Sequence, residues 1–210
     1  MPLLRDGMTT APAWCELKDF AIVSLAAGEG CEFPRSAAKE RLIVASGSCR
    51  ITFGGEEVAA NAGDKYELPD AEAHFAITAT EEPTTVVRLC GTWGAETGGW
   101  GLFSVEESDA PEWGDPTAYP KRTRIDNHYH DCDEYWIVLA GQGTAVSEGQ
   151  RYAMSPGDCL ATGMGHHHDF PLVTEPVRAV FFETTLEGER RRGHLWNHAH
   201  GPAQPQPGRV

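Results

Sequence analysis

Four side chains in the second half of the sequence have the types and spacing of a metal site. His128 and His130 stand two residues apart, and Glu134 follows four residues later. His168 lies further along the chain. In a β-strand, residues i and i+2 point to the same face, so the first two imidazoles can converge on one point. Three imidazoles and one carboxylate suit a divalent transition metal, and we predict a metal centre formed by these four residues.

The predicted ligand set is rich in nitrogen and contains one oxygen donor. We expect one divalent ion per chain, with Fe or Mn favoured and Ni, Zn, Co or Cu able to use the same ligands. Because such ions commonly accept five or six ligands, four protein ligands leave positions for a substrate, water or dioxygen.

Short β-type runs surround these residues and must position them. The runs are four to six residues long, rich in β-branched and aromatic residues, and separated by Gly, Pro and Asp. They cover residues 41–45, 49–53, 84–89, 135–139 and 177–182. This pattern is typical of antiparallel strands, and no helical periodicity competes with it. The sequence therefore predicts an all-β protein.

An internal repeat divides the chain into two halves. Three separated matches share one offset of 94 residues: 40–47 with 134–141, Gly63-Asp64 with Gly157-Asp158, and His74 with His168. A constant offset over separated matches indicates a duplicated structural unit. We therefore expect an N-terminal arm (1–14), a first β-barrel (15–92), a Trp- and Gly-rich linker (93–117), a second barrel (118–186) and a C-terminal tail (187–210).

The residues of the second half resemble the motifs of the cupin superfamily. Its first motif is HxH, then a Glu after three or four residues, then a Gly six residues on; its second is a Pro-Gly-Asp turn, a Gly and a His. The matching residues are His128, His130, Glu134 and Gly141 for the first motif, and Pro156-Gly157-Asp158, Gly165 and His168 for the second. Two positions depart from the pattern: Arg122 replaces a Gly before the first motif, and Leu172 replaces an Asn that often closes the second. Neither is a metal ligand in that family.

The resemblance implies a fold of two tandem cupin barrels, which are double-stranded β-helices or jelly rolls. It also implies that Glu134 can leave the metal during turnover and act as the catalytic base. It does not identify a reaction, since cupins include dioxygenases, decarboxylases, isomerases, epimerases, lyases and non-catalytic binding proteins.

The first half departs from the motif at two ligand positions. By the repeat, Pro34 and Ser36 stand where the second half has the HxH pair, whereas Glu40 and His74 keep the other two positions. Proline cannot bind a metal and serine binds one poorly. We therefore expect the first barrel to be structural and free of metal; a degenerate binding pocket is the alternative.

Three residues near the predicted ligands are candidates for substrate binding. Arg124 shares a strand face with His128 and could bind a carboxylate or phosphate, or else pair with Asp126 at the barrel rim. Trp136 and Phe170 each lie two residues after a predicted ligand, so in a strand they would face the same side as that ligand and could line a cavity. Ordinary core packing is the alternative for both aromatic residues.

Composition and charge restrict the partners. The chain of 210 residues has 17 Lys and Arg against 31 Asp and Glu, a net charge of -14, which disfavours nucleic acid and anionic membrane surfaces. No apolar run approaches the ~20 residues of a membrane span. The first ten residues lack the features of a secretion signal, so we expect a cytoplasmic protein. The six cysteines form no CxxC pair, and we expect them to be free thiols. A small-molecule substrate is the expected partner, and a homodimer formed through sheet edges is the expected assembly.

These observations favour a metal-dependent enzyme that acts on a small, oxygen-rich organic molecule. The three-His ligand set suits oxygen-binding metals, which favours oxidation of the dioxygenase type with Fe(II) or Mn(II). Redox-neutral isomerisation or lysis of a sugar or hydroxy acid is the first alternative. A non-catalytic bicupin that binds a metabolite is the second.

Overall fold

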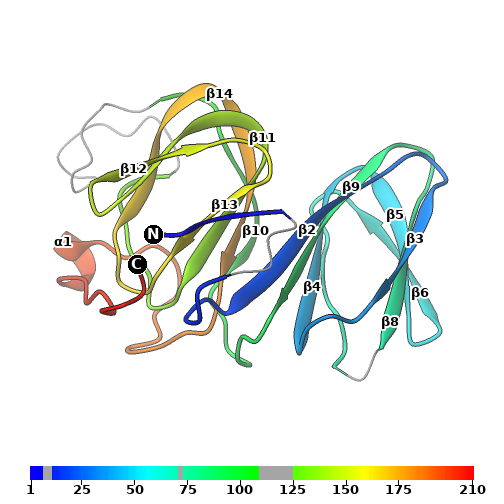
Figure 1. Cartoon of the computed structure of the whole chain (residues 1–210), viewed down its shortest axis with the longest axis horizontal. Helices are drawn as coiled ribbons and strands as arrows, with labels where there is room; N and C mark the ends of the chain where they lie inside the picture. The colour runs from blue at the N-terminus through cyan, green and yellow to red at the C-terminus, as the bar shows by residue number, and fades with distance from the viewer. Residues whose placement is uncertain (7–10, 71–72, 109–124) are drawn as a thin grey trace. The chain divides into compact units, whose positions relative to one another are not determined.

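The computed structural model describes residues 1–6, 11–70, 73–108 and 125–210. Within them the chain forms fourteen strands and one short helix, α1 (Asn197–His200), and is all-β, as predicted (Figure 1). It divides into an N-terminal unit, Leu17–Thr92, and a C-terminal unit, Met1–Glu16 together with Trp93–Val210. In the described part of the chain, no helix is long and apolar enough to cross a bilayer.

The C-terminal unit contains one antiparallel sheet with the order β1-β13-β11-β14-β10, and β12 pairs with β11. Its two long strands, β11 and β14, curve and change register four times along their shared ladder. Such irregularities bend a sheet and let one strand contribute to two faces. The strands are β1 (Leu3–Arg5), β10 (Trp100–Val105), β11 (Glu134–Ser147), β12 (Gln150–Met154), β13 (Asp158–Thr162) and β14 (His168–Glu183).

The N-terminal unit contains two antiparallel four-stranded sheets, with the orders β2-β9-β4-β7 and β3-β8-β5-β6. The strands are β2 (Leu17–Leu25), β3 (Gly30–Pro34), β4 (Lys39–Ser46), β5 (Ser48–Phe53), β6 (Glu56–Asn61), β7 (Lys65–Glu67), β8 (His74–Ala79) and β9 (Thr84–Gly91). Among the described residues, the pairings leave all three sheets of the protein open, so two closed tandem barrels stay a prediction.

The segments expected to be arm, linker and tail belong to the C-terminal unit. β1 lies in the expected arm and pairs with β13, where Leu4 stands opposite Cys159. β10 lies in the expected linker and pairs with β14 along its whole length. The tail binds the same unit through Arg191 and Arg209. The boundaries therefore differ from those expected, because these contacts join segments that are distant in sequence.

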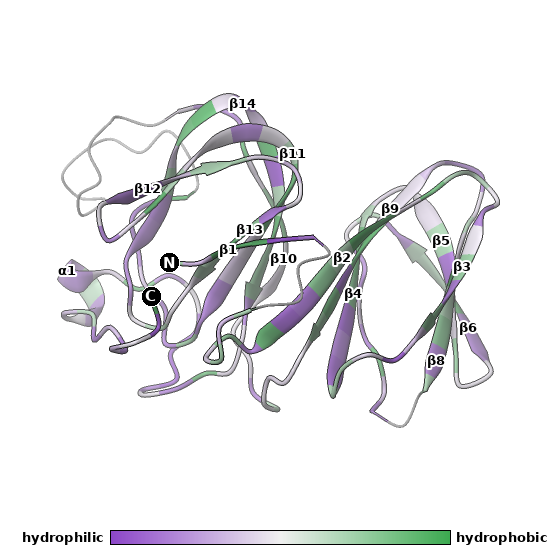
Figure 2. Ribbon diagram, in the orientation of Figure 1, coloured by the Kyte–Doolittle hydropathy of each residue, from purple (hydrophilic) through white to green (hydrophobic). Residues whose placement is uncertain are grey.

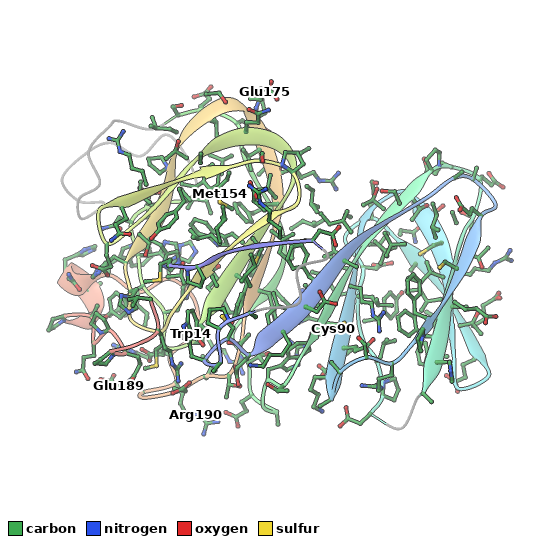
Figure 3. All side chains as sticks on the ribbon, viewed as in Figure 1. Trp14, Cys90, Met154, Glu175, Glu189 and Arg190 are labelled. Atoms are coloured by element: carbon green, nitrogen blue, oxygen red, sulfur yellow. The ribbon has the colours of Figure 1, made fainter. Side chains whose placement is uncertain are left out.

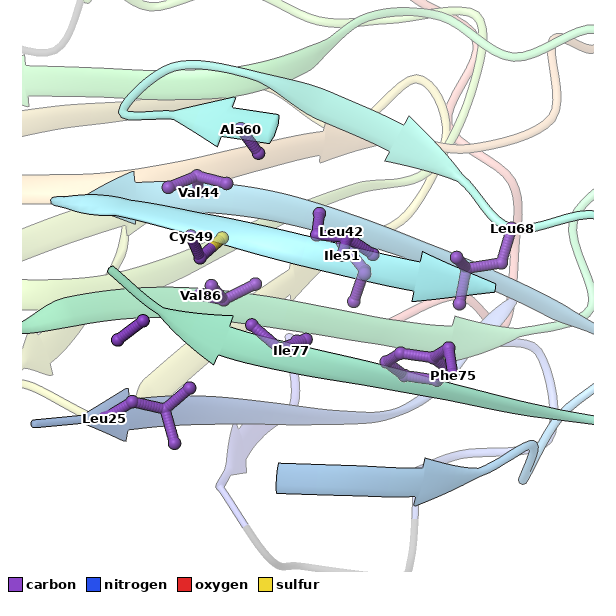
Figure 4. Close-up of a cluster of buried hydrophobic side chains, with 11 residues drawn as sticks. Leu25, Leu42, Val44, Cys49, Ile51, Ala60, Leu68, Phe75, Ile77 and Val86 are labelled. Carbon is purple, nitrogen blue, oxygen red and sulfur yellow. The ribbon is translucent and has the colours of Figure 1, made fainter. Parts of the chain in front are cut away.

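Each unit has its own apolar core. Eleven buried residues fill the space between the two sheets of the N-terminal unit, among them Leu42, Ile51 and Ile77 (Figure 4). The C-terminal core includes Met154 and Val138, whereas the charged side chain of Glu175 lies on the outside of the bend in β14 (Figure 3). Apolar and polar residues alternate along several strands, as a sheet with one buried face requires (Figure 2).

Two glycines of the motifs have backbone angles that other residues avoid. Gly141 has a φ of 78°, and a Cβ there would lie 1.9 Å from the carbonyl oxygen of Pro176. Gly165 has a φ of 76° and donates its N–H to the carbonyl of His130. The first glycine permits the turn within β11, and the second fixes the loop before His168 against the ligand-bearing segment.

Candidate metal centre

Two short backbone bridges hold the HxH segment in place. His128 exchanges two hydrogen bonds with His168, of 3.1 and 2.9 Å, in an isolated antiparallel bridge. Tyr129 forms the same kind of bridge with Leu195 of the C-terminal segment. The segment is thus extended without being part of a strand, and consecutive residues face opposite sides. Glu134 is the first residue of β11 and His168 the first of β14.

The four predicted ligands converge around one carboxylate oxygen. Oε2 of Glu134 lies 2.6 Å from Nε2 of His168, 3.2 Å from Nε2 of His130 and 3.9 Å from Nε2 of His128. One ligand atom from each residue lies within 4.8 Å of all the others. All four side chains are buried, with at most 4% of any residue exposed. The structure therefore brings together the predicted set.

The hydrogen bonds around the imidazoles fit a bound cation. Nδ1 of His128 bonds the carbonyl oxygen of Asp126, and Nδ1 of His168 bonds that of His166. When Nδ1 donates to a carbonyl, the lone pair of Nε2 faces the other way, here toward the cluster. In the described structure, Nε2 of His128 and Nε2 of His130 are buried without a hydrogen bond of acceptable geometry. Buried nitrogens of this kind are expected where a metal ion is the missing partner.

Electrostatics favour an ionised Glu134 and a neutral imidazole at two of the three histidines, whereas at His130 they favour a proton that a bound metal would displace. Burial holds the pKa of His128 well below its ordinary value, and burial also lowers the pKa of His168. Burial would raise the pKa of Glu134, but the neighbouring His130 and His168 outweigh it and hold that pKa well below 4.5. Burial lowers the pKa of His130, but the carboxylate of Glu134 outweighs it and raises that pKa overall. Neutral imidazoles next to an ionised carboxylate are the ligands that divalent metals bind.

Two other candidate groupings overlap the main cluster. Asp126 and His194 could share a metal with His128, and Cys132 and Glu183 could share one with His130. Burial and then the nearby carboxylates raise the pKa of the Cys132 thiol well above 9.0, which favours the neutral thiol. Of the three groupings, only the main cluster has three imidazoles and an ionised carboxylate.

A cavity of about 460 Å³ opens next to Glu134. Its wall is mostly apolar. It is lined by Gly98, Gly99, Phe103, Ile125, Glu134, Trp136, Phe181, Glu183, Arg192, Gly193 and His194. The volume suits a small organic molecule.

The three expected substrate-binding residues have different places. Trp136 lines the cavity, as expected from its place two residues after Glu134 in the same strand. Phe170 is completely buried in the apolar core, 6.0 Å from the ring of Trp136, and is not among the residues that line the cavity. This placement agrees with ordinary core packing, the alternative expected for this residue. Arg124 lies outside the described residues.

The C-terminal segment contributes residues that sequence reasoning missed. The imidazole of His194 stacks on that of His128, with ring centroids 3.7 Å apart and planes 12° apart. Its Nδ1 lies 3.6 Å from the carboxylate of Asp126, which also accepts the indole N–H of Trp196. Nothing in the local sequence of His194 marks it, because the contact depends on how the last 24 residues fold back.

Glu183 is a second buried carboxylate beside the centre. It lies at the end of β14, opposite Glu134 in the register of β11 and β14. Its Oε1 is 3.8 Å from Nδ1 of His130, and its other oxygen accepts the backbone N–H of Gly99. A Cβ on Gly98 would lie 2.2 Å from the same carboxylate, so the glycine pair permits this close approach. The Gly-rich sequence is the signal that could have indicated it.

Comparisons with known proteins agree with this geometry. Residues 117–183 match the Cupin domain family. The chain is 43% identical over 211 residues to the uncharacterized protein y4oW of Sinorhizobium fredii, covering 100% of this chain and 97% of that protein. It is 26% identical over 183 residues to quercetin 2,3-dioxygenase of Bacillus subtilis, covering 80% of this chain and 50% of that enzyme.

A solved structure shows the same fold. A mutant of Bacillus subtilis oxalate decarboxylase matches with a TM-score of 0.55 and 12% identity, over 84% of this chain and 70% of that one. At that identity the likeness concerns the fold alone. The chain therefore belongs to the same family as y4oW, and its residues 117–183 form a cupin domain.

Proposed function

We propose that this protein is a metal-dependent cupin enzyme that carries out dioxygenase-type oxidation of a small organic molecule. The observation that carries the proposal is the buried cluster of three imidazoles and Glu134, whose carboxylate also lines the cavity. The similarity to quercetin 2,3-dioxygenase supports the reaction type, although it spans half of that enzyme.

The ligands would be His128, His130, Glu134 and His168. A bound divalent ion would supply Lewis acidity or one-electron redox chemistry at the end of the cavity. Glu134 is ionised and faces the cavity, so its carboxylate can accept a proton from a hydroxyl group of the substrate. The stacked His194 and the carbonyl of Asp126 hold the ring of His128.

The residues that line the cavity restrict the chemical class of substrate that we expect. Phe103, Trp136 and Phe181 provide an aromatic surface, and Gly98 and Gly99 add no side-chain bulk to the wall. Such a wall excludes water and favours a flat, apolar body over a free sugar. We propose a substrate with this body and with hydroxyl, carbonyl or carboxylate oxygens directed at the ligand cluster.

Oxygen uptake by reconstituted protein tests the proposal. The protein is freed of metal, loaded separately with Fe(II) or Mn(II), and supplied with flavonols, catechols, diketones and hydroxy acids at an oxygen electrode. Uptake with a substrate that has an aromatic body, and its loss in Glu134→Gln, is the expected result. Conversion without uptake would favour an isomerase or lyase, and tight binding without conversion would favour a non-catalytic protein. Either of these two results contradicts the dioxygenase proposal.

A further inference from the structure

In each unit, the strand that contains the motif glutamate pairs with the last strand of that unit. The two pairings have matching registers. In the C-terminal unit, Glu134 stands opposite Glu183, and two residues along β11 Trp136 stands opposite Phe181. Both residues of this second pair line the cavity beside the predicted metal ligands. This ladder gives a reference for the same positions in the N-terminal unit.

In the N-terminal unit, the equivalent ladder is that of β4 and β9. Glu40 stands opposite Cys90, and two residues along β4 Leu42 stands opposite Arg88. Glu40 is the repeat partner of Glu134. The register therefore places Arg88 at the position that Phe181 has in the other unit.

The equivalence includes the imidazole positions. Pro34 stands opposite His74 in the ladder of β3 and β8, just as His128 stands opposite His168 in its isolated bridge. The offset of the sequence repeat is thus reproduced by backbone pairing. Ser36 takes the remaining position, that of the second imidazole.

The guanidinium group of Arg88 binds three of these four equivalent positions. Nε and Nη2 donate to the two carboxylate oxygens of Glu40, at 3.0 and 2.8 Å. Nη2 also donates to the carbonyl oxygen of Pro34, at 2.8 Å, and to the hydroxyl of Ser36, at 3.1 Å. A cation therefore lies among the residues that replace the metal ligands.

The groups around Arg88 and Glu40 stabilise a buried cation. Glu40 is completely buried and Arg88 is 9% exposed. The guanidinium carbon lies 5.4 Å from the ring centroid of Phe33 and 5.2 Å from that of Phe75, within the range of cation–π attraction. Oε1 of Glu40 also accepts the backbone N–H groups of Ser36 and Ala37. A buried charge pair of this kind is tolerated only when its hydrogen bonds are complete.

We propose that Arg88 is a built-in cation that replaces the metal ion of the N-terminal unit. Its side chain fills the space beside Glu40 and neutralises that carboxylate, so the unit folds without a metal and has no room for one. The chain then holds one metal ion, in the C-terminal unit, and the duplicated centre is kept as a structural ion pair.

Chemical rescue of a truncated side chain tests the cation. In Arg88→Ala, Glu40 is left as a buried unpaired charge, and we expect the melting temperature of the N-terminal unit to fall by about 10 °C or more. Ethylguanidinium, added far below denaturing concentrations, is expected to restore most of that loss. Ethylammonium lacks the planar fork and ethylurea lacks the charge, so neither is expected to do so. Arg50→Ala is the control, because Arg50 is an exposed arginine of the same unit, 3.8 Å from Glu57.

The rescue experiment has two overturning outcomes. The proposal is wrong if Arg88→Ala melts within a few degrees of Arg50→Ala. It is also wrong if ethylurea restores stability as well as ethylguanidinium does, because the site would then need shape rather than charge.

A metal count provides a second test that does not depend on the stability of Arg88→Ala. It uses His130→Ala as background, so that metal bound in the C-terminal unit is strongly reduced. Adding Pro34→His and Ser36→His supplies both missing imidazoles. With Arg88 present we expect no gain in zinc or cobalt content, whereas a further Arg88→Phe is expected to add about one ion per chain. Equal metal content with and without Arg88 would show that its side chain does not occupy the cation position. The outcome is independent of the enzymatic proposal, because no activity is measured.

Discussion

Glu134 is the residue on which the candidate centre depends. Its Oε2 lies within 3.9 Å of all three imidazole Nε2 atoms, and its pKa is held low by His130 and His168. Its counterpart Glu40 has an arginine in place of the imidazoles. We propose that the carboxylates at these two matching positions bind different cations, a metal ion at Glu134 and a guanidinium group at Glu40.

Replacing a predicted metal ligand should lower metal content, whereas the corresponding change in the N-terminal unit should not. His130→Ala removes an imidazole whose Nε2 faces the cluster, so we expect metal affinity to fall by more than the ~10–100-fold typical of an outer-shell partner. His74→Ala, at the position of the N-terminal unit that corresponds to His168, should leave metal content unchanged. Metal analysis of both purified variants measures this. Equal losses in the two variants would contradict the asymmetry between the units.

The ion pair of Glu40 predicts a dependence of stability on pH. Burial would raise the pKa of Glu40, but hydrogen bonds from Arg88 and the backbone outweigh it and lower that pKa below its ordinary value of 4.5. A carboxyl group with a lowered folded pKa contributes stability above the unfolded pKa and loses it as the pH falls through the folded one. We therefore expect the N-terminal unit to weaken below about pH 4.5.

Glu40→Gln tests this pH dependence. The variant should be less stable at pH 7, because Arg88 loses its charged partner, and its stability should fall less steeply in acid. Thermal melts between pH 7 and pH 3 compare the two proteins. Parallel curves would show that the Glu40 carboxyl does not contribute to the acid sensitivity.

At the scale of elements, the C-terminal segment is the part that completes the centre. Residues 187–210 reach the ligand-bearing loop through ion pairs and through the bridge of Leu195 with Tyr129. Arg191 donates to the carboxylate of Asp131 with two nitrogens, at 2.9 Å each, and its backbone N–H adds a third bond. Burial would raise the pKa of Asp131, but Arg191 outweighs it and lowers that pKa.

Loosening this attachment should expose the segment. Arg191→Ala removes the two side-chain bonds to the buried carboxylate of Asp131 and leaves only the bond from the backbone N–H, so we expect a loss of about 1–3 kcal/mol. Limited proteolysis should then cleave the last 20 residues faster. Arg190→Ala is the matched control, since Arg190 pairs with Glu96 at the surface, where a single ion pair contributes little. Equal cleavage of the two variants would show that Arg191 does not anchor the segment.

The stacking of His194 on His128 makes a separate prediction. His194→Ala removes the ring that covers a ligand, and we expect metal affinity to fall by about 10-fold. His194→Phe keeps a ring at that place and should recover part of the loss. His198→Ala, at an exposed position of α1, is the control. Competition with a chelator measures the metal affinity of all three variants. An unchanged affinity in His194→Ala would show that His194 does not support the metal centre.

Much of this architecture was predictable from sequence because its signals are local. The HxH spacing and the motif glycines are short-range patterns, and the 94-residue offset reappears as the matching pairs Pro34–His74 and His128–His168. The roles of His194 and Arg88 were not predictable, because each depends on a contact across many residues.

For the whole molecule, the account predicts two units with different dependence on metal. A ligand that binds only the folded state stabilises it by about 4 kcal/mol at a concentration 1,000 times its dissociation constant. Removal of metal should therefore lower the melting temperature of the C-terminal unit and leave that of the N-terminal unit unchanged. Calorimetry before and after chelation, with metal restored as the control, measures both. A shift of both units together would contradict the division.

The position of the metal itself tests the central claim most directly. A crystal of the metal-loaded protein, measured at the absorption edge of its ion, gives an anomalous difference map that locates every bound atom. The account predicts one peak per chain, about 2.0–2.2 Å from Nε2 of His128, His130 and His168 and from a carboxylate oxygen of Glu134. A map without that peak, or with a second peak beside Glu40 and Arg88, would contradict it.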